Sequence, residues 1–425
     1  MTHWLHRIVS VIVAVVVGGA TVAVWREARR VRRTTGDADA ASRPTSREQV
    51  LLGMVGTAAA LYAVQIIVGG LQIITSLADW AVALHLALGA LIWALLAAAT
   101  IYSFYETRVA RAVEVQTPGS DPGTEPAVDP AKQSTVRERV SAYVALTKPR
   151  IIELLLVTTV PAMVIAQRGI PPLMLVFWTL LGGSLAAGAA NAINCYLDRD
   201  IDLLMTRTRR RPLPAHSVQP EDALVFGLAL GVVSFGVLAL FTNLVAAFLT
   251  LVAIAFYVVI YTMLLKRSTP QNIVLGGAAG ALPPVIGWAA VTGDIGLPAL
   301  VLFAVVFYWT PPHFWALSMR LARDYEAAHV PMMPVTHGIP ETTRQIALYS
   351  VLMVCLTLVF FSVAHMGLIY LAGALLLGGL FLFQAFAMWR EGTDRRAVRL
   401  YKFSITYLSG LFALMVIDVL LAPIL

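Results

Sequence analysis

Long runs of apolar residues, separated by short polar segments, follow one another along almost the whole chain. Each run has about 20 residues, the length that an α-helix needs to cross about 30 Å of hydrocarbon. Because lipid offers no hydrogen bonds to the backbone, we expect an all-α polytopic membrane protein. The pattern predicts twelve spans, near residues 5–25, 49–76, 81–105, 150–168, 172–196, 222–242, 244–264, 273–291, 297–318, 344–365, 367–389 and 404–422.

The composition agrees with this interpretation, since 59% of the residues are hydrophobic, 13% are charged and the mean hydropathy is +0.78. A net charge of +7 could indicate a nucleic-acid partner, but the basic residues gather in alternate loops. By the positive-inside rule, these loops face the cytoplasm of a cell membrane, which excludes nucleic acid and places both termini outside. The basic loops cover residues 26–33, 106–150, 199–211, 266–267, 320–344 and 390–402.

A polar segment divides the chain into two parts. Residues 107–139 are rich in Pro, Gly, Asp and Glu, which predicts a flexible cytoplasmic linker. We therefore expect a three-span module over residues 1–106 and a nine-span domain over 140–425. The first span lacks a small-residue cleavage pattern, so it is interpreted as a retained helix rather than a signal peptide. The cysteines Cys195 and Cys355 show no pairing pattern and predict no disulfide.

A stripe of polar residues occupies the cytoplasmic end of the fifth predicted span. On a continuous helix, Asn191, Asn194, Asp198 and Asp202 fall within an arc of about 80°, whereas Asp200 points elsewhere. Ionisable groups at membrane depth normally line a functional cavity. Oxygen ligands of this kind favour Mg²⁺, which takes one or two carboxylates together with phosphate oxygens. The alternative is that these acids pair with the neighbouring Arg199, Arg207 and Arg209.

Cations that suit a diphosphate recur in several cytoplasmic loops. A diphosphate held by cations and Mg²⁺ becomes a stabilised leaving group, so the combination predicts group transfer from a diphosphate ester. The candidate phosphate-binding cations are Lys148, Arg207, Lys266 and Arg267.

The chain resembles the UbiA superfamily of membrane prenyltransferases in several separated stretches: LTKPRI, NCYLDRDIDLLMTRTRRRPLP, YTMLLKRSTPQNIVLGGAAGALPPVIGW and TPPHFWALSMRLARDYEAAHVPMMPV. These stretches are similar to the branch that farnesylates heme, and the resemblance covers residues 140–425. It implies a nine-helix UbiA-type bundle that transfers farnesyl from farnesyl diphosphate to the 2-vinyl group of protoheme IX, with water completing the product, heme O. It also implies that Asn194, Asp198 and Asp202 hold Mg²⁺ on the diphosphate.

The second aspartate motif of the superfamily is altered here. The corresponding loop reads RLARDYEA, in which Asp324 is the candidate ligand for a second Mg²⁺ and Arg320 the candidate partner of a heme propionate. His313 is the favoured residue of the acceptor site, and Trp315 beside it is a candidate porphyrin wall. The alternatives are a histidine that only packs in the core, and arginines that only set the topology.

The N-terminal module contains one polar residue of interest, His85, within an apolar span. Together with Gln65, Gly69 and Gly70, it resembles one helix pair of the heme A synthases. That resemblance makes His85 a candidate heme ligand and heme A synthase a candidate partner. The alternative is a buried histidine that bonds a neighbouring helix.

Two other functions remain open from the residues alone. A prenyltransferase of this kind could use a quinone precursor, a chlorophyllide or a lipid as acceptor, because the diphosphate site does not define the acceptor. A transporter would carry its acids near the middle of the membrane, whereas here they gather at the cytoplasmic mouth beside arginines.

Overall fold

The computed structural model describes residues 46–74 and 135–421, together with Gly19 and single positions between 84 and 102. The predicted spans near 5–25 and 81–105, and most of the predicted linker, lie outside the residues described in full. The chain separates into two compact units, Met1–Gln133 and Ser134–Leu425, each of which is described by itself.

In the first unit, helix α2 (Ser46–Ile74) contains a stretch long and apolar enough to span a membrane, Leu51–Gly69. Its Ala58 packs with Ile92 and Leu96 in a small apolar cluster. Small residues also bring side chains close together, since a Cβ at Gly69 would lie 3.3 Å from the His85 ring. His85 therefore packs against α2; its heme role stays a prediction.

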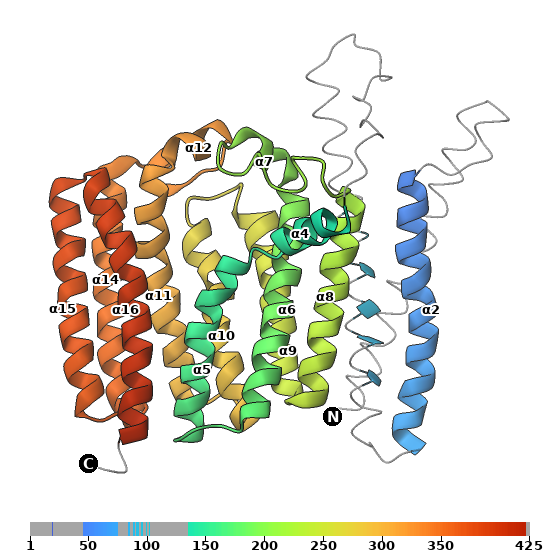
Figure 1. Ribbon diagram of the computed structural model, residues 1–425, viewed down its shortest axis with the longest axis horizontal. Helices are drawn as coiled ribbons and strands as arrows, with labels where there is room; N and C mark the ends of the chain where they lie inside the picture. Colours follow the sequence, from blue (N-terminus) through green and yellow to red (C-terminus); the bar gives the residue numbers. More distant parts are fainter. Residues whose placement is uncertain are drawn as a thin grey trace, which may run out of the picture. The chain divides into compact units, whose positions relative to one another are not determined.

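The second unit is a bundle of helices that run side by side (Figure 1). Nine helical segments form the bundle, as the sequence predicts for residues 140–425, and the described part contains no β-strand. They are α5 (Pro149–Gln167), α6 (Leu173–Leu197), α8 (Pro220–Phe241), α9 (Leu244–Ala255) continued by the π-helix η2 (Phe256–Leu265), α10 (Asn272–Thr292), α11 (Leu297–Arg320), α14 (Gly338–Val363), α15 (Leu368–Glu391) and α16 (Asp394–Leu421).

Two helices begin earlier than their apolar runs. The sequence predicts spans from 344 and 404, whereas α14 begins at Gly338 and α16 at Asp394. The added turns contain charged residues, and a helix continues through such turns outside the hydrocarbon because its backbone bonds do not depend on lipid. The end of the linker also differs, since helix α4 (Val136–Leu146) begins within it at a capping box of Thr135 and Glu138.

Small residues allow the helices of the bundle to approach closely. A Cβ at Gly182 on α6 would lie 2.5 Å from Leu238 on α8, and one at Gly227 on α8 would lie 2.7 Å from Ile193 on α6. The Ser234 hydroxyl adds a hydrogen bond of 2.7 Å to the Gly182 carbonyl. Close packing and interhelical hydrogen bonds of this kind hold helices together in lipid, where the hydrophobic effect does not.

At the end of the bundle opposite α7, two charged side chains satisfy helix termini. Arg168 donates to the Ala364 carbonyl at the end of α14, at 2.5 Å. Asp418 on α16 accepts from the backbone N–H groups of Gly367 and Tyr370 at the start of α15, at 2.5 and 3.0 Å. Because unpaired backbone groups are costly in a membrane, these two residues define the turn between α14 and α15.

This arrangement predicts that Asp418 stabilises the bundle. We expect Asp418→Ala to lower the free energy of unfolding by about 1.5–3 kcal/mol, the range for hydrogen bonds to charged groups. Thermal unfolding of the purified protein in detergent measures this, with the exposed Asp394→Ala as the matched control. An equal effect of both substitutions would contradict the capping role.

Short helices cover the other end of the bundle (Figure 1). They are α7 (Arg199–Leu204), which follows α6, and α12 (Ala322–Ala327) and α13 (Met333–Thr336), which follow α11. The basic loops 199–211 and 320–344 therefore lie at the same end of the bundle, where α4 also joins α5.

Candidate active site

The helix that carries the polar stripe is interrupted at Asp198. Helix α6 ends at Leu197, and Asp198 has φ −95° and ψ 3° before α7 begins. The expectation of one continuous regular helix was therefore wrong. The hydrogen bonds from Asp198 N–H to the Asn194 carbonyl and from Asp202 N–H to the Asp198 carbonyl persist, at 2.9 and 2.8 Å. Asn194, Asp198 and Asp202 remain close in the chain and are all buried.

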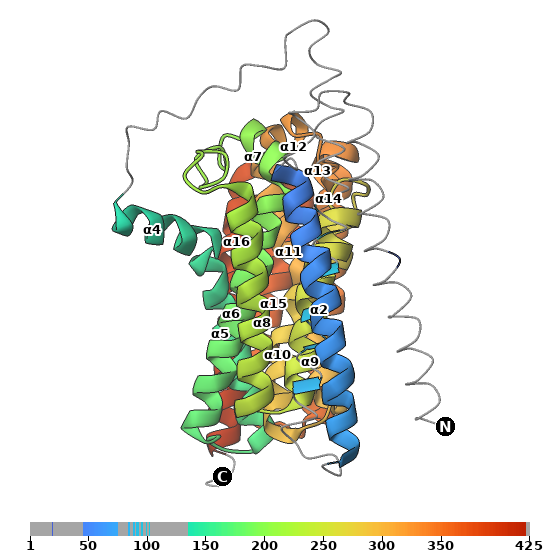
Figure 2. The same cartoon turned by 90° about the vertical axis from the view of Figure 1, so that its right-hand side faces the viewer.

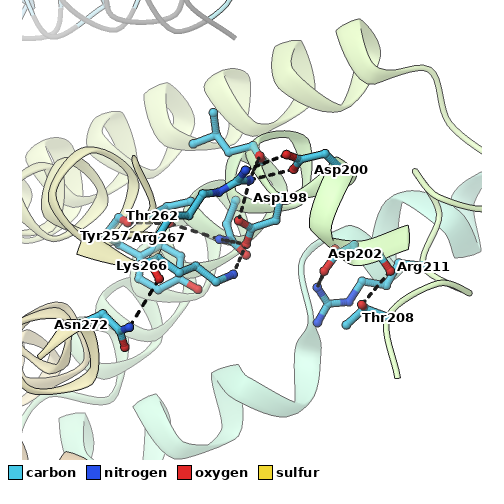
Figure 3. Close-up of polar contacts among 12 residues, drawn as sticks. Asp198, Asp200, Asp202, Thr208, Arg211, Tyr257, Thr262, Lys266, Arg267 and Asn272 are labelled. Carbon is cyan, nitrogen blue, oxygen red and sulfur yellow. Dashed lines mark hydrogen bonds and ion pairs between the residues drawn. The ribbon is translucent and has the colours of Figure 1, made fainter. Parts of the chain in front are cut away.

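Asp198 lies at the centre of a cluster of cations (Figure 3). Its side chain is fully buried, and its Oδ2 accepts from Lys266 Nζ and, at 2.7 Å, from Asn194 Nδ2. Arg267 Nη2 lies 3.7 Å from the other oxygen, Oδ1. Burial acts to lower the pKa of Lys266, but the charge of Asp198 outweighs it and holds that pKa above its usual value. Lys266 therefore stays positively charged.

Arg267 joins Asp200 to this cluster. Its Nη1 and Nη2 donate to the two oxygens of Asp200 at 2.6 and 2.7 Å, and Nη2 also donates to the Leu197 carbonyl at 2.9 Å. The Asp200 side chain is 40% exposed. Burial acts to raise the pKa of Asp200, but the hydrogen bonds and charge of Arg267 outweigh it, so that this pKa lies below its usual value.

Asp202 has a different partner, which the sequence analysis missed. Arg211 Nη1 donates to both oxygens of Asp202, at 3.0 and 2.8 Å, and the Thr208 hydroxyl donates to the Asp202 carbonyl at 2.9 Å (Figure 3). Arg211 is one of four arginines in the segment RTRRRPLP. Spacing alone does not indicate which of them turns inward. The other three, Arg207, Arg209 and Arg210, are exposed.

Lys148 reaches the cluster from the junction of α4 and α5. It adopts a left-handed conformation with φ 51°, directly before Pro149. Its Nζ donates to Asn194 Oδ1 at 2.6 Å, and Asn191 Nδ2 donates to the adjacent Thr147 carbonyl at 3.0 Å. Burial lowers the pKa of Lys148. Of the four predicted phosphate cations, Lys148, Lys266 and Arg267 meet around Asn194 and Asp198, whereas Arg207 does not.

A π-helix, η2, lies directly before Lys266 and Arg267 and positions both cations. The i→i+5 bonds of η2 turn the chain by roughly 80° per residue, against about 100° in an α-helix, so ten residues change the direction of the next side chain by about half a turn. The Thr262 hydroxyl donates to the Tyr257 carbonyl five residues earlier at 2.8 Å, and accepts from Asn194 Nδ2 at 3.2 Å. Thr262 thus connects the π-helix directly to the polar stripe.

His313 lies in a second polar environment, between α11 and α16. Its Nδ1 is 2.7 Å from Ser404 Oγ, and the Ser404 hydroxyl lies 2.7 Å from the Tyr401 carbonyl, to which it donates. Ser404 therefore accepts from His313 Nδ1–H, which leaves Nε2 as the nitrogen with a lone pair. The ring stacks on Trp309 at 4.2 Å and packs against Tyr401 at 4.7 Å.

The other residues predicted for the acceptor site, Trp315 and Arg320, do not form a single wall with His313. Trp315 is fully buried and meets Tyr349 of α14 edge-on, at 5.4 Å, so it belongs to the core between α11 and α14. Arg320 is exposed at the end of α11, and Asp324 is half-buried in α12 at the same end of the bundle as α7.

The carboxylates of the site offer Mg²⁺ few ready ligands. Within the described ranges, no three His, Cys, Asp or Glu side chains are grouped to share a metal ion. Asp198 Oδ1 is buried and accepts no hydrogen bond from any described residue, whereas Asn194 Oδ1 and both oxygens of Asp202 already have donors. One open carboxylate oxygen fits an ion that takes few protein ligands and completes its shell with phosphate oxygens and water.

Comparison with known proteins identifies the class of this bundle. Residues 155–409 match the UbiA prenyltransferase family, and the chain belongs to this family. It is therefore a membrane prenyltransferase. The fold is similar to that of a digeranylgeranylglyceryl phosphate synthase (TM-score 0.57, 18% identity, 66% of this chain and 99% of the other). It is also similar to a UbiA homologue from Aeropyrum pernix K1 (TM-score 0.52, 21% identity, 63% and 99%).

Curated relatives are more similar in sequence. A protoheme IX farnesyltransferase from Parafrankia is 53% identical over 279 residues, which are 65% of this chain and 89% of the relative. Another from Chloroflexus aurantiacus is 43% identical over 401 residues, which are 94% of this chain and 64% of the relative. Because the second match is longer than the unit Ser134–Leu425, it extends into the first unit.

Proposed function

We propose that this chain transfers the farnesyl group of farnesyl diphosphate to the 2-vinyl group of protoheme IX, with addition of water, to give heme O and diphosphate. The observation that carries the donor half is the buried pair of Asn194 and Asp198 enclosed by Lys148, Lys266 and Arg267. The acceptor half is supported by relatives named protoheme IX farnesyltransferase and by His313.

The cations of the site act as clamps on the diphosphate. Lys148 now binds the amide oxygen of Asn194, while Lys266 and Arg267 neutralise Asp198 and Arg211 neutralises Asp202. A diphosphate offers them a stronger anionic partner, and its arrival releases the oxygens of Asn194 and Asp202. Asp198, with Asn194 and Asp202 as further ligands, would hold Mg²⁺, which would supply Lewis-acid stabilisation of the leaving diphosphate. The cations stabilise the negative charge that develops on the diphosphate as its C–O bond to the farnesyl group breaks.

The acceptor must lie where the allylic cation is protected from water. The vinyl group attacks C1 of the farnesyl cation, and water captures the carbon next to the porphyrin with loss of a proton. Ser404 fixes Nδ1 of His313 as the protonated nitrogen, so Nε2 keeps a lone pair that can accept a proton or contact the heme. We assign His313 to contact with the heme or to removal of that proton.

Competition between acceptors tests the proposal. We expect purified protein with farnesyl diphosphate and Mg²⁺ to convert protoheme, and to leave 4-hydroxybenzoate unchanged, as measured by mass spectrometry of both acceptors. His313→Ala should lower heme O formation by about 10²-fold or more, the range of acid–base catalysis, without weakening binding of farnesyl diphosphate. Prenylation of the benzoate with protoheme untouched would refute the heme assignment and leave the prenyltransferase class standing.

We also propose that the site opens to the cytoplasm, because the basic loops gather at that end of the bundle. The prediction uses Ser120→Cys in the linker and Asp294→Cys in the opposite turn, both in a Cys355→Ser background. A membrane-impermeant thiol reagent should label the first only from the cytoplasmic side and the second only from outside. The reverse result would overturn the orientation.

A further inference from the structure

Helix α4 lies across the direction of the spans. Figure 2 shows it extending sideways from the bundle, near the end that carries α7 and α12, and Figure 1 also shows it transverse to α5 and α6. Its last turn is fixed to the bundle, because Leu146 is buried and the Tyr143 ring meets Phe226 of α8 edge-on at 5.0 Å. The first two turns extend beyond these contacts.

Three valines form an exposed row on this helix. Val136, Val140 and Val144 are 79%, 57% and 51% exposed, although each lies four residues from the next and could have packed as one face. At about 100° per residue they cover an arc of about 80°. Arg137 and Arg139 flank this arc on its two sides and are exposed, whereas Glu138 lies opposite it.

This distribution of side chains is typical of a helix that lies in the interface of a membrane. Such a helix buries its apolar face in the acyl-chain boundary and extends basic side chains toward lipid phosphates. The bundle to which α4 is joined crosses the membrane, so lipid surrounds the start of α5 and is continuous with the space beside α4. A water-exposed helix in the same place would gain nothing from an aligned row of three valines.

We propose that α4 is an interfacial helix whose Val136, Val140 and Val144 insert into the cytoplasmic leaflet, with Arg137 and Arg139 against the phosphates of anionic lipids. The helix is joined through Thr147 to Lys148, whose backbone is left-handed and whose side chain binds Asn194. Seating α4 on lipid therefore fixes the direction from which Lys148 enters the site. The proposal rests on the membrane-spanning bundle and does not require the heme assignment.

Spin-label accessibility tests this proposal on the full chain. Val140→Cys and Ala145→Cys are made in a Cys355→Ser background, since Cys195 is buried. Each is labelled with a nitroxide in nanodiscs of phosphatidylcholine and phosphatidylglycerol. Ala145 is the matched control, because it is exposed on the same helix about 140° from Val140. We expect collisions with oxygen to exceed those with a polar nickel chelate at position 140, and the reverse at position 145.

Two results would overturn the proposal. Equal access of the nickel chelate to positions 140 and 145 would place the valine row in water. Low access of both oxygen and nickel at position 140 would mean that protein covers the row, from residues 1–133 or from a second copy of the chain. Val144→Cys provides a second position on the row if the label at 140 disturbs the helix, and it must give the same result as Val140→Cys for the proposal to stand.

Discussion

Asp198→Asn should lower farnesyl transfer by about 10²–10³-fold, the range found when one group that stabilises transition-state charge is removed. Asp198 is the carboxylate with an open, buried oxygen, and it also holds Lys266 and Asn194 in place. The asparagine keeps the shape of the side chain but removes its charge. Release of diphosphate and formation of heme O, measured over a range of Mg²⁺ concentrations, should both fall.

Asp200→Asn is the matched control for this substitution. Asp200 is 40% exposed and bonds only Arg267 among the cations of the site. Asp200→Asn should therefore lower farnesyl transfer less than Asp198→Asn does. Equal losses at both positions would mean that the two acids are equivalent and that Asp198 has no special role.

Unfolding must be separated from loss of catalysis, because Asp198→Asn leaves Lys266 as a buried charge without its carboxylate. The double variant Asp198→Asn/Lys266→Met removes both charges. We expect it to regain thermal stability without regaining activity. Recovery of activity together with stability would show that the single substitution acted only through folding.

The fold could be predicted from the sequence because lipid restricts the possible structures. A run of about 20 apolar residues in lipid must form a helix, because its backbone groups find hydrogen-bond partners only within the chain. The nine segments expected after residue 140 are the nine segments of the bundle. Helix ends were less predictable, as α14 and α16 show, since charged turns such as those after Asp394 can continue a helix outside the membrane.

The site could be predicted only in part. Residue type and spacing indicate Asn194, Asp198, Lys148 and Lys266, because a buried amide or carboxylate requires donors. They do not indicate Arg211, because its selection among four arginines depends on how the loop after α7 folds. Of the two interpretations of the acids, the structure shows pairing with cations, which are Lys266, Arg267 and Arg211; the role of the acids as Mg²⁺ ligands stays a prediction.

The π-helix was not predictable from the sequence. The segment FYVVIYTMLL is apolar apart from Thr262, so it has no polar face whose repeat would distinguish a wider helix from an α-helix. Thr262 is the polar residue within it that bonds both the π-helix and Asn194. The direction of Lys266 and Arg267 therefore depends on a feature that only the structure reveals.

Thr262→Val should separate this positioning role from general stability. Valine has nearly the same shape as threonine but cannot accept from Asn194 or donate to the Tyr257 carbonyl. Removing one partner of a buried polar group costs about 1–3 kcal/mol, or roughly 5- to 150-fold. The side-chain amide of Asn194 also orients Lys148, a cation of the diphosphate site. We therefore expect Thr262→Val to act mostly by raising the KM for farnesyl diphosphate.

Two comparisons decide this prediction. Thr262→Ser retains the hydroxyl and should restore the KM for farnesyl diphosphate to near its original value. The KM for protoheme should change little in Thr262→Val, because His313 is held by α16 through Ser404, far along the chain from η2. An equal rise in both KM values, or a serine variant as impaired as the valine, would contradict a positioning role and indicate that Thr262 only supports the packing of the bundle.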